Sequence, residues 1–254
     1  MKTKIISLLV AMTIVGTAFL LSCSEKSIEK DTWEQQSASQ GLLNLYQTSA
    51  PLLADVTSRT PSTRSDNALQ ASAEAIENEV ASCLKEYDAI GQMKASGYYK
   101  VKIDEDSLSM LQANFYGYAE FVKDNGTPRY AEVLQRLVDG KPLNLTKEDI
   151  SNDKNMLIVE KIPLLLMLAV LEAPAQNITT RDGNNCLDMY YAQRSSCALD
   201  YAGSCAASIG TGIVSGIIGP AIGVAWATYQ LDKCLDTAND MYIMCQKIQE
   251  SQQK

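Results

Sequence analysis

Two related stretches near the end of the chain have the sequences CLDMYYAQRSSC (186–197) and CLDTANDMYIMC (234–245). In each, ten residues separate two cysteines, and the first cysteine begins a Cys-Leu-Asp triplet. Eleven residues advance an α-helix by about 1100 degrees, three turns and roughly 20 degrees more, so both cysteines lie on one face. Two such helices placed antiparallel can be cross-linked twice. The pattern predicts an αα-hairpin with the bridges Cys186–Cys245 and Cys197–Cys234.

A competing register and a metal site remain alternatives for these cysteines. Gly219-Pro220 is a strong turn signal, and a hairpin centred there pairs Cys205 with Cys234. In that register Cys197 lies eight residues before Cys205, and Cys245 lies eleven residues after Cys234. Eight residues place the side chain of Cys197 about 80 degrees away from the helix face that carries Cys205, so a second bridge fits poorly. Zinc ligation is the third interpretation, although ten-residue separations without histidine are unlike zinc-site spacing. When Cys186 pairs with Cys245 and Cys197 with Cys234, Cys205 has no partner in the hairpin. We therefore predict a third bridge, from Cys205 to Cys83.

The segment between the paired cysteines is rich in glycine and carries no charge over AASIGTGIVSGIIGPAIGVAWATY (206–229). Its glycines recur at four-residue spacing, which lets helices approach closely in lipid, and the indole of Trp226 suits a membrane interface. A soluble protein can use the same glycines to pack the tip of a hairpin, so both interpretations stay open. The residues predicted to contact a membrane are Gly212, Gly216, Gly219, Gly223 and Trp226.

Composition and charge exclude several classes of function. The chain has 254 residues, a formal net charge of -8 and no histidine. An acidic chain does not offer the positive surface that nucleic acid requires, so we expect no nucleic-acid partner. Without imidazole there is no Ser/His or Cys/His nucleophilic pair. No catalytic motif is present, and we expect a protein that is not an enzyme and holds no cofactor or metal.

The first residues resemble the signal peptide of a bacterial lipoprotein. MKTK is followed by an apolar run to Leu21, and small Ser22 precedes Cys23 as in a lipobox. The resemblance implies removal of residues 1–22 and lipidation of Cys23. We therefore expect export, with a lipid anchor in the outer membrane or at the cell surface, and a released or secreted form is also compatible. The six other cysteines would then lie in a compartment that permits disulfides.

Two linkers divide the rest of the chain. Residues 23–65 comprise a tether, a helix broken at Pro51 and an exposed segment that contains Arg59 and Arg64. Residues 66–172 have helical periodicity and predict a bundle. Residues 173–185 form a second linker with Arg181, and residues 186–254 form the Cys/Gly-rich hairpin. The expected sites of proteolytic cleavage are Arg181, Arg64 and Arg59.

Periodicity and helix signals place the helices of the bundle. An apolar seam in steps of four and three runs from Leu69 through Cys83 to Ile90. A helix is expected to end at Asn125-Gly126, and Thr127-Pro128 opens the next one as N-cap and N1. The range 151–172 contains IPLLLMLAVL, apolar all round, which predicts the central buried helix. The predicted fold is all-α, a helical bundle followed by a disulfide-stapled αα-hairpin with a glycine-rich apolar tip.

The signal segment and the last 73 residues together resemble antimicrobial lipoprotein toxins of Bacteroidales, which are bacteriocin-like and activated by proteolysis. This resemblance implies that an arginine-specific protease cuts the linkers and that the hairpin then acts on the envelope of a competing bacterium. The implied partners are that protease and an envelope component, with a membrane as a further candidate. The alternative is a non-toxic surface lipoprotein that binds a protein or glycan through its bundle.

Overall fold

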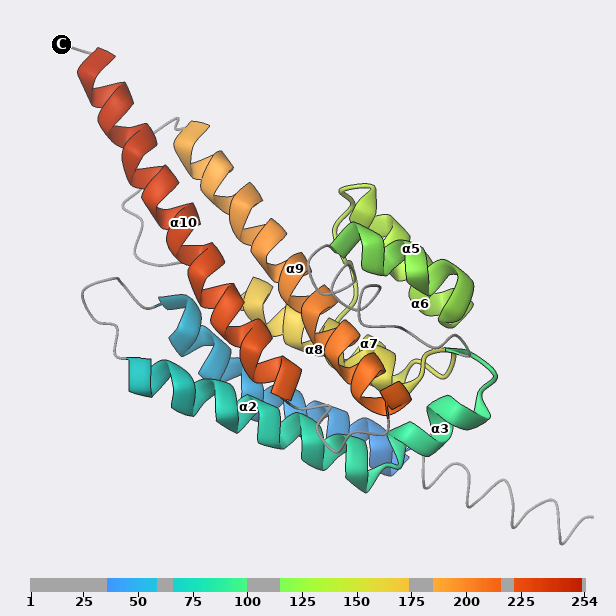
Figure 1. Ribbon diagram of the computed structural model, residues 1–254. Coiled ribbons are helices and arrows are strands. Elements are labelled where there is room, and N and C mark those ends of the chain that lie inside the picture. The colour runs from blue at the N-terminus through green and yellow to red at the C-terminus, as the bar shows by residue number, and fades with distance from the viewer. Residues whose placement is uncertain (1–35, 59–65, 100–114, 174–184, 216–221, 253–254) are drawn as a thin grey trace, which may run out of the picture. The chain divides into compact units, whose positions relative to one another are not determined.

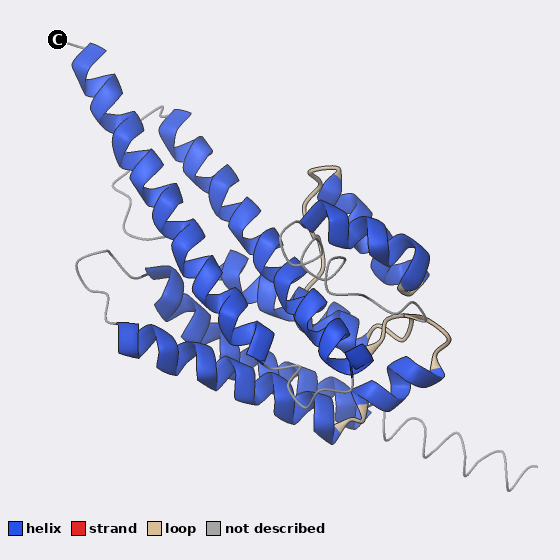
Figure 2. Cartoon of the chain, in the orientation of Figure 1, coloured by secondary structure: helices blue, strands red, loops and turns tan. Residues whose placement is uncertain are grey.

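The protein is all-α, as predicted. The computed structural model describes residues 36–58, 66–99, 115–173, 185–215 and 222–252, and within these ranges it contains helices and no strand (Figure 2). The chain divides into two compact units, Met1–Gly41 and Leu42–Lys254, and all contacts described below lie within the second. After the helix at residues 36–58, the elements are α2 Asp66–Glu86, α3 Ala89–Ala95, α5 Phe115–Asn125, α6 Pro128–Val138, α7 Lys147–Asn152, α8 Ile158–Glu172, α9 Asn185–Ser215 and α10 Ile222–Gln252.

The first helices follow the predicted apolar spacing but differ from the prediction in where they end. The interruption expected at Pro51 does not occur, because residues 42–58 are helical throughout and Leu42, Leu53 and Val56 are buried. The seam of α2 is buried through Cys83, yet the helix stops at Glu86. Asp88 adopts a left-handed backbone with φ of 44°, and its carboxylate accepts the N–H of Gly91. This cap starts the separate helix α3.

The helix start predicted at Thr127-Pro128 is confirmed. Thr127 is the N-cap of α6, its hydroxyl accepts the N–H of Tyr130, and Pro128 is at N1. α5 ends at Asn125, as expected from the Asn125-Gly126 pair. Because proline lacks an N–H and has a fixed φ, it suits the first position of a helix, where that N–H has no intrahelical partner.

The apolar run forms the centre of the core, as predicted, although it starts later in the chain. Every residue of α8 from Ile158 to Val170 is buried. The predicted range began at Ser151, but residues 147–152 belong to α7, which begins with a capping box between Thr146 and Asp149. A helix that is apolar on all sides has to be covered on all sides. α9, α7 and α3 supply contacts to α8.

The hairpin packs along the bundle with both of its helices. α9 and α10 are antiparallel, and Figure 1 shows them side by side, with α8 against α9 and α2 against α10. α9 also contacts α5. The hairpin and the bundle helices of residues 66–172 therefore share one core, in which each helix of the hairpin has its own partner.

Candidate functional site: the stapled hairpin

The two predicted staples are confirmed. Cys186 bonds to Cys245 and Cys197 to Cys234, and the Cα–Cα distance is 5.7 Å in both bridges. This result excludes the register in which Cys205 pairs with Cys234. Among the residues that the structure describes, no group of cysteine and carboxylate side chains could hold a metal ion. Both cross-links lie within residues 186–245.

The predicted third bridge is wrong. Cys83 on α2 and Cys205 on α9 are both free and both buried. α2 packs on α10, α3 and α8, whereas Cys205 hydrogen-bonds with Tyr201 and lies near Tyr130 of α6. The two thiols therefore face different parts of the core. Burial raises the pKa of each thiol to about 12, so both are protonated at neutral pH.

Gly223 packs against the other helix of the hairpin, not against an open surface. A Cβ atom at Gly223 would lie 2.0 Å from the Oγ and 2.1 Å from the Cβ of Ser208 on α9. The absence of a side chain is what lets the helices approach closely at this point. Of the other glycines predicted to contact a membrane, Gly212 lies in α9, and Gly216 and Gly219 lie outside the described residues.

Trp226 is an exposed aromatic residue at the same end of α10. Its side chain is 60% exposed, and its ring stacks on Tyr229 with centroids 5.8 Å apart and 22° between the planes. The ammonium group of Lys233 lies 5.2 Å from the centroid of the Tyr229 ring. These three residues recur along one side of α10 and hold the indole in place. Over the ranges given above, no helix is long and apolar enough to cross a bilayer.

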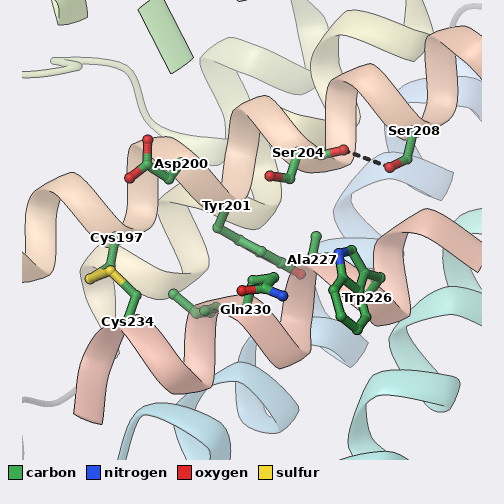
Figure 3. A pocket seen from close by; sticks show the side chains of 10 residues that line it. Cys197, Asp200, Tyr201, Ser204, Ser208, Trp226, Ala227, Gln230 and Cys234 are labelled. Carbon is green, nitrogen blue, oxygen red and sulfur yellow. Dashed lines mark hydrogen bonds between the residues drawn. A yellow bond between two sulfur atoms is a disulfide. The ribbon is translucent and has the colours of Figure 1, made fainter. Parts of the chain in front are cut away.

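A groove of about 420 Å³ runs between α9 and α10. The Cys197–Cys234 bridge lies at one end and Trp226 lies toward the other (Figure 3). Tyr201 reaches from α9 toward α10, where its hydroxyl pairs with that of Thr228 at 3.3 Å. The polar side chains that line the groove are Asp200, Ser204, Ser208 and Gln230.

Burial raises the pKa of the Asp200 carboxyl, and a hydrogen bond from the backbone N–H of Phe115 opposes this change. Asp200 therefore also connects the edge of the groove to the start of α5. The same carboxylate thus supports the fold and contributes charge to the groove.

Arg194 joins the hairpin to the central helix. Its buried guanidinium donates to the carbonyl of Val170 at 3.1 Å and to that of Ala173, at the C-terminal end of α8. A cation at this end interacts favourably with the helix dipole and satisfies carbonyls that have no intrahelical partner. Glu172, the last residue of α8, accepts a hydrogen bond from the hydroxyl of Tyr46. Both contacts are thus at the end of α8, directly before the linker that contains Arg181.

A buried carboxylate in the bundle was not found from the sequence. Glu160 is fully buried and accepts hydrogen bonds from the Leu157 N–H, the Thr127 N–H, the Thr127 hydroxyl and the Tyr99 hydroxyl, at 2.7 to 2.9 Å. Burial raises the pKa of Glu160, and these hydrogen bonds oppose the change. The signal was its position three residues after the N-cap of an apolar helix, which is typical of a capping box. With four donors, Glu160 acts as a structural junction of α6 and α8.

The remaining predicted site residues lie outside the described residues. These are the lipidation site Cys23 and the cleavage sites Arg59, Arg64 and Arg181. No protein-family model, no curated protein and no solved structure matches this chain.

Proposed function

We propose that this protein is an exported antimicrobial toxin that is activated by proteolysis. An arginine-specific protease cuts the linker at Arg181, with Arg59 and Arg64 as further sites. The hairpin, residues 186–254, then acts on an envelope component of a competing bacterium, with a membrane as a possible partner. In this proposal the protein is delivered as a lipoprotein through Cys23.

The observation that carries the proposal is the placement of the disulfides. Both bridges lie within the hairpin, and Cys83 of the bundle is free. A cut in the linker at 173–185 therefore leaves a hairpin that carries both bridges and is held to the bundle by non-covalent contacts, such as the hydrogen bonds of Arg194. Because Cys83 and Cys205 are both free, no bridge among the described cysteines joins the two parts after cleavage.

The contact between hairpin and bundle supports a restraining role for the bundle. The face of α9 toward the core is apolar, with Ala198, Ala202 and Ile209 buried, and Arg194 donates to the end of α8. A free hairpin would expose this face, and exposed apolar surfaces are typical of segments that bind a partner or a membrane. The uncut linker keeps the hairpin at high local concentration beside the bundle.

The far end of the hairpin already presents apolar side chains. Met241, Met244 and Ile248 lie on one side of α10 at helical spacing, and their side chains are 44%, 65% and 51% exposed. The same part of α10 contributes Tyr242 to a small buried cluster beside the Cys186–Cys245 bridge, in which Tyr190 and Tyr242 pack together. This exposed stripe supports contact with an envelope component.

The test compares wild-type protein with Arg181→Gln, before and after treatment with an arginine-specific protease. On a denaturing gel without reductant, cut wild-type protein should give separate fragments on either side of position 181, whereas the variant should remain joined there. In a spot assay on related strains, only cut wild-type protein should inhibit growth. If cut protein inhibits no strain of a broad panel and leaves membranes intact, the toxin proposal is wrong.

A second candidate is a non-toxic surface lipoprotein that binds a protein or glycan through its bundle. It is favoured by an open groove of about 570 Å³ between the N-terminal end of α6 and the residues before α8, lined by Tyr98, Arg129, Glu132, Lys154 and Met156. Lys154→Glu reverses one charge in this groove. It should abolish partner binding if this candidate is right and leave growth inhibition unchanged if the toxin proposal is right.

A further inference from the structure

We propose that the groove between α9 and α10 binds a neutral, hydroxyl-rich sugar chain, with the indole of Trp226 as the surface on which a sugar ring stacks. The inference goes beyond the proposed function, because binding requires neither cleavage nor toxicity. If the toxin proposal also holds, it names the chemical class of the envelope component.

The first support is the exposed and braced indole. An indole that is 60% exposed presents a flat apolar face to water, and a ligand ring that covers this face gains free energy by removing apolar surface from water. Stacking on Tyr229, itself in contact with Lys233, restricts the rotation of the ring. A ring that is already held in place loses little conformational entropy on binding a flat ligand face.

The second support is the set of polar groups around this ring. Gln230 follows Trp226 by one helical turn and lines the same groove, and Ser204 lines it from α9 (Figure 3). Amide and hydroxyl groups both donate and accept hydrogen bonds, as sugar hydroxyls do. An apolar wall with a few polar groups is the usual composition of a small-ligand site, and about 420 Å³ is in the usual range.

The charges select a neutral sugar over an anionic one. Among the described residues that line the groove, Asp200 is the one with a formal charge, and the whole chain carries -8. An anionic ligand would therefore be repelled.

The register of the hairpin argues against a small organic cation. Because of the two bridges, Asp200 lies opposite Leu231, and Trp226 lies opposite Cys205. Asp200 and Trp226 are thus displaced by five residues, about 7.5 Å along the helices. One ammonium group cannot contact both the carboxylate and the indole at this separation, but a chain of sugar rings can span it.

The test uses the fluorescence of Trp226 in the full chain. The sequence contains two tryptophans, so Trp33→Phe leaves Trp226 as the only indole. This protein is titrated with chitotriose, maltotriose, cellotriose and mannotriose, with trigalacturonate as the anionic counterpart, and with choline and phospholipid vesicles of phosphatidylethanolamine and phosphatidylglycerol. At least one neutral trisaccharide should give a saturable emission shift, and trigalacturonate, choline and the vesicles should give none.

Variants in the Trp33→Phe background locate the site. Gln230→Ala and Ser204→Ala should each weaken the Kd for the active trisaccharide about fivefold, the usual effect of losing one neutral hydrogen bond. Gln249→Ala, on α10 outside the groove, should leave the Kd unchanged. The proposal is overturned if no neutral trisaccharide gives a saturable shift, if choline or vesicles give the shift instead, or if the groove variants bind as tightly as the control.

Discussion

Gly223→Ala tests whether this glycine serves the packing of the hairpin. The added Cβ would lie 2.1 Å from the Cβ of Ser208, which is fixed to the backbone of α9 and cannot rotate away. Carbon atoms pack at about 3.5 to 4.0 Å, so the helices would have to separate by about 1.5 Å at this point. Overpacking of this kind costs about 1 to 3 kcal/mol. The helix propensity of alanine offsets part of the cost, by up to about 1 kcal/mol.

The free energy of unfolding, measured by urea denaturation with the disulfides intact, should therefore fall by about 1 to 2 kcal/mol. The matched control is Gly203→Ala on α9, where the new Cβ would meet Phe115 at an ordinary 3.4 Å and the variant should be neutral or stabilising. Ser208→Gly removes the obstructing side chain, so in that background Gly223→Ala should no longer destabilise. If Gly223→Ala behaves like Gly203→Ala in the wild-type background, the packing role is refuted.

Three further predictions concern the core. Alkylation in denaturant without reductant should label Cys83 and Cys205. The same reagent should label neither thiol in the native protein at neutral pH, because both are buried with pKa values of about 12. Peptide mapping that finds the two cysteines bonded to each other would show that the third bridge does form. Glu160→Gln should lower the free energy of unfolding by about 1 to 3 kcal/mol, because an amide cannot accept from all four donors. Glu132→Gln on the exposed face of α6 removes one ion pair with Arg129 and should cost less, about 0.5 kcal/mol. Because the folded-state pKa of Glu160 lies above its ordinary 4.5, wild-type stability should fall as the pH rises from 4.5 through that raised pKa, and the difference from Glu160→Gln should shrink over this interval. Arg194→Met should destabilise by about 1 to 3 kcal/mol, because the carbonyls at the end of α8 lose their donor, and hydrogen exchange should increase there; unchanged exchange would contradict the capping role.

Local signals predicted much of the architecture. The equal spacing of cysteines in two stretches favoured both bridges and the register of the hairpin, and the structure confirms them over the register that pairs Cys205 with Cys234. Thr127-Pro128 placed the start of α6, and the apolar run identified α8 as the central helix. These features depend on helix geometry over one to three turns, and the residues involved are close together in the sequence, so their spacing can be read from it.

Features that depend on distant residues were not predicted. The leftover Cys205 was assigned to Cys83 by counting, but whether two thiols meet depends on which helices pack together, and α2 packs on α10. The four donors to Glu160 come from three separate segments, and Arg194 caps a helix that ends more than twenty positions earlier. Such contacts connect residues whose proximity is set by the packing of the whole core.

The paired cysteine stretches thus predicted, by themselves, that residues 186–245 form a helical hairpin with two staples, because helical periodicity and bridge geometry are local properties. Only the tertiary structure decided that Gly223 faces Ser208, that Cys83 and Cys205 are not bonded to each other and that a groove opens beside Trp226. The physical reason is that apolar burial is non-directional: it drives the helices together, while side-chain volume and hydrogen bonding at each contact select which faces meet.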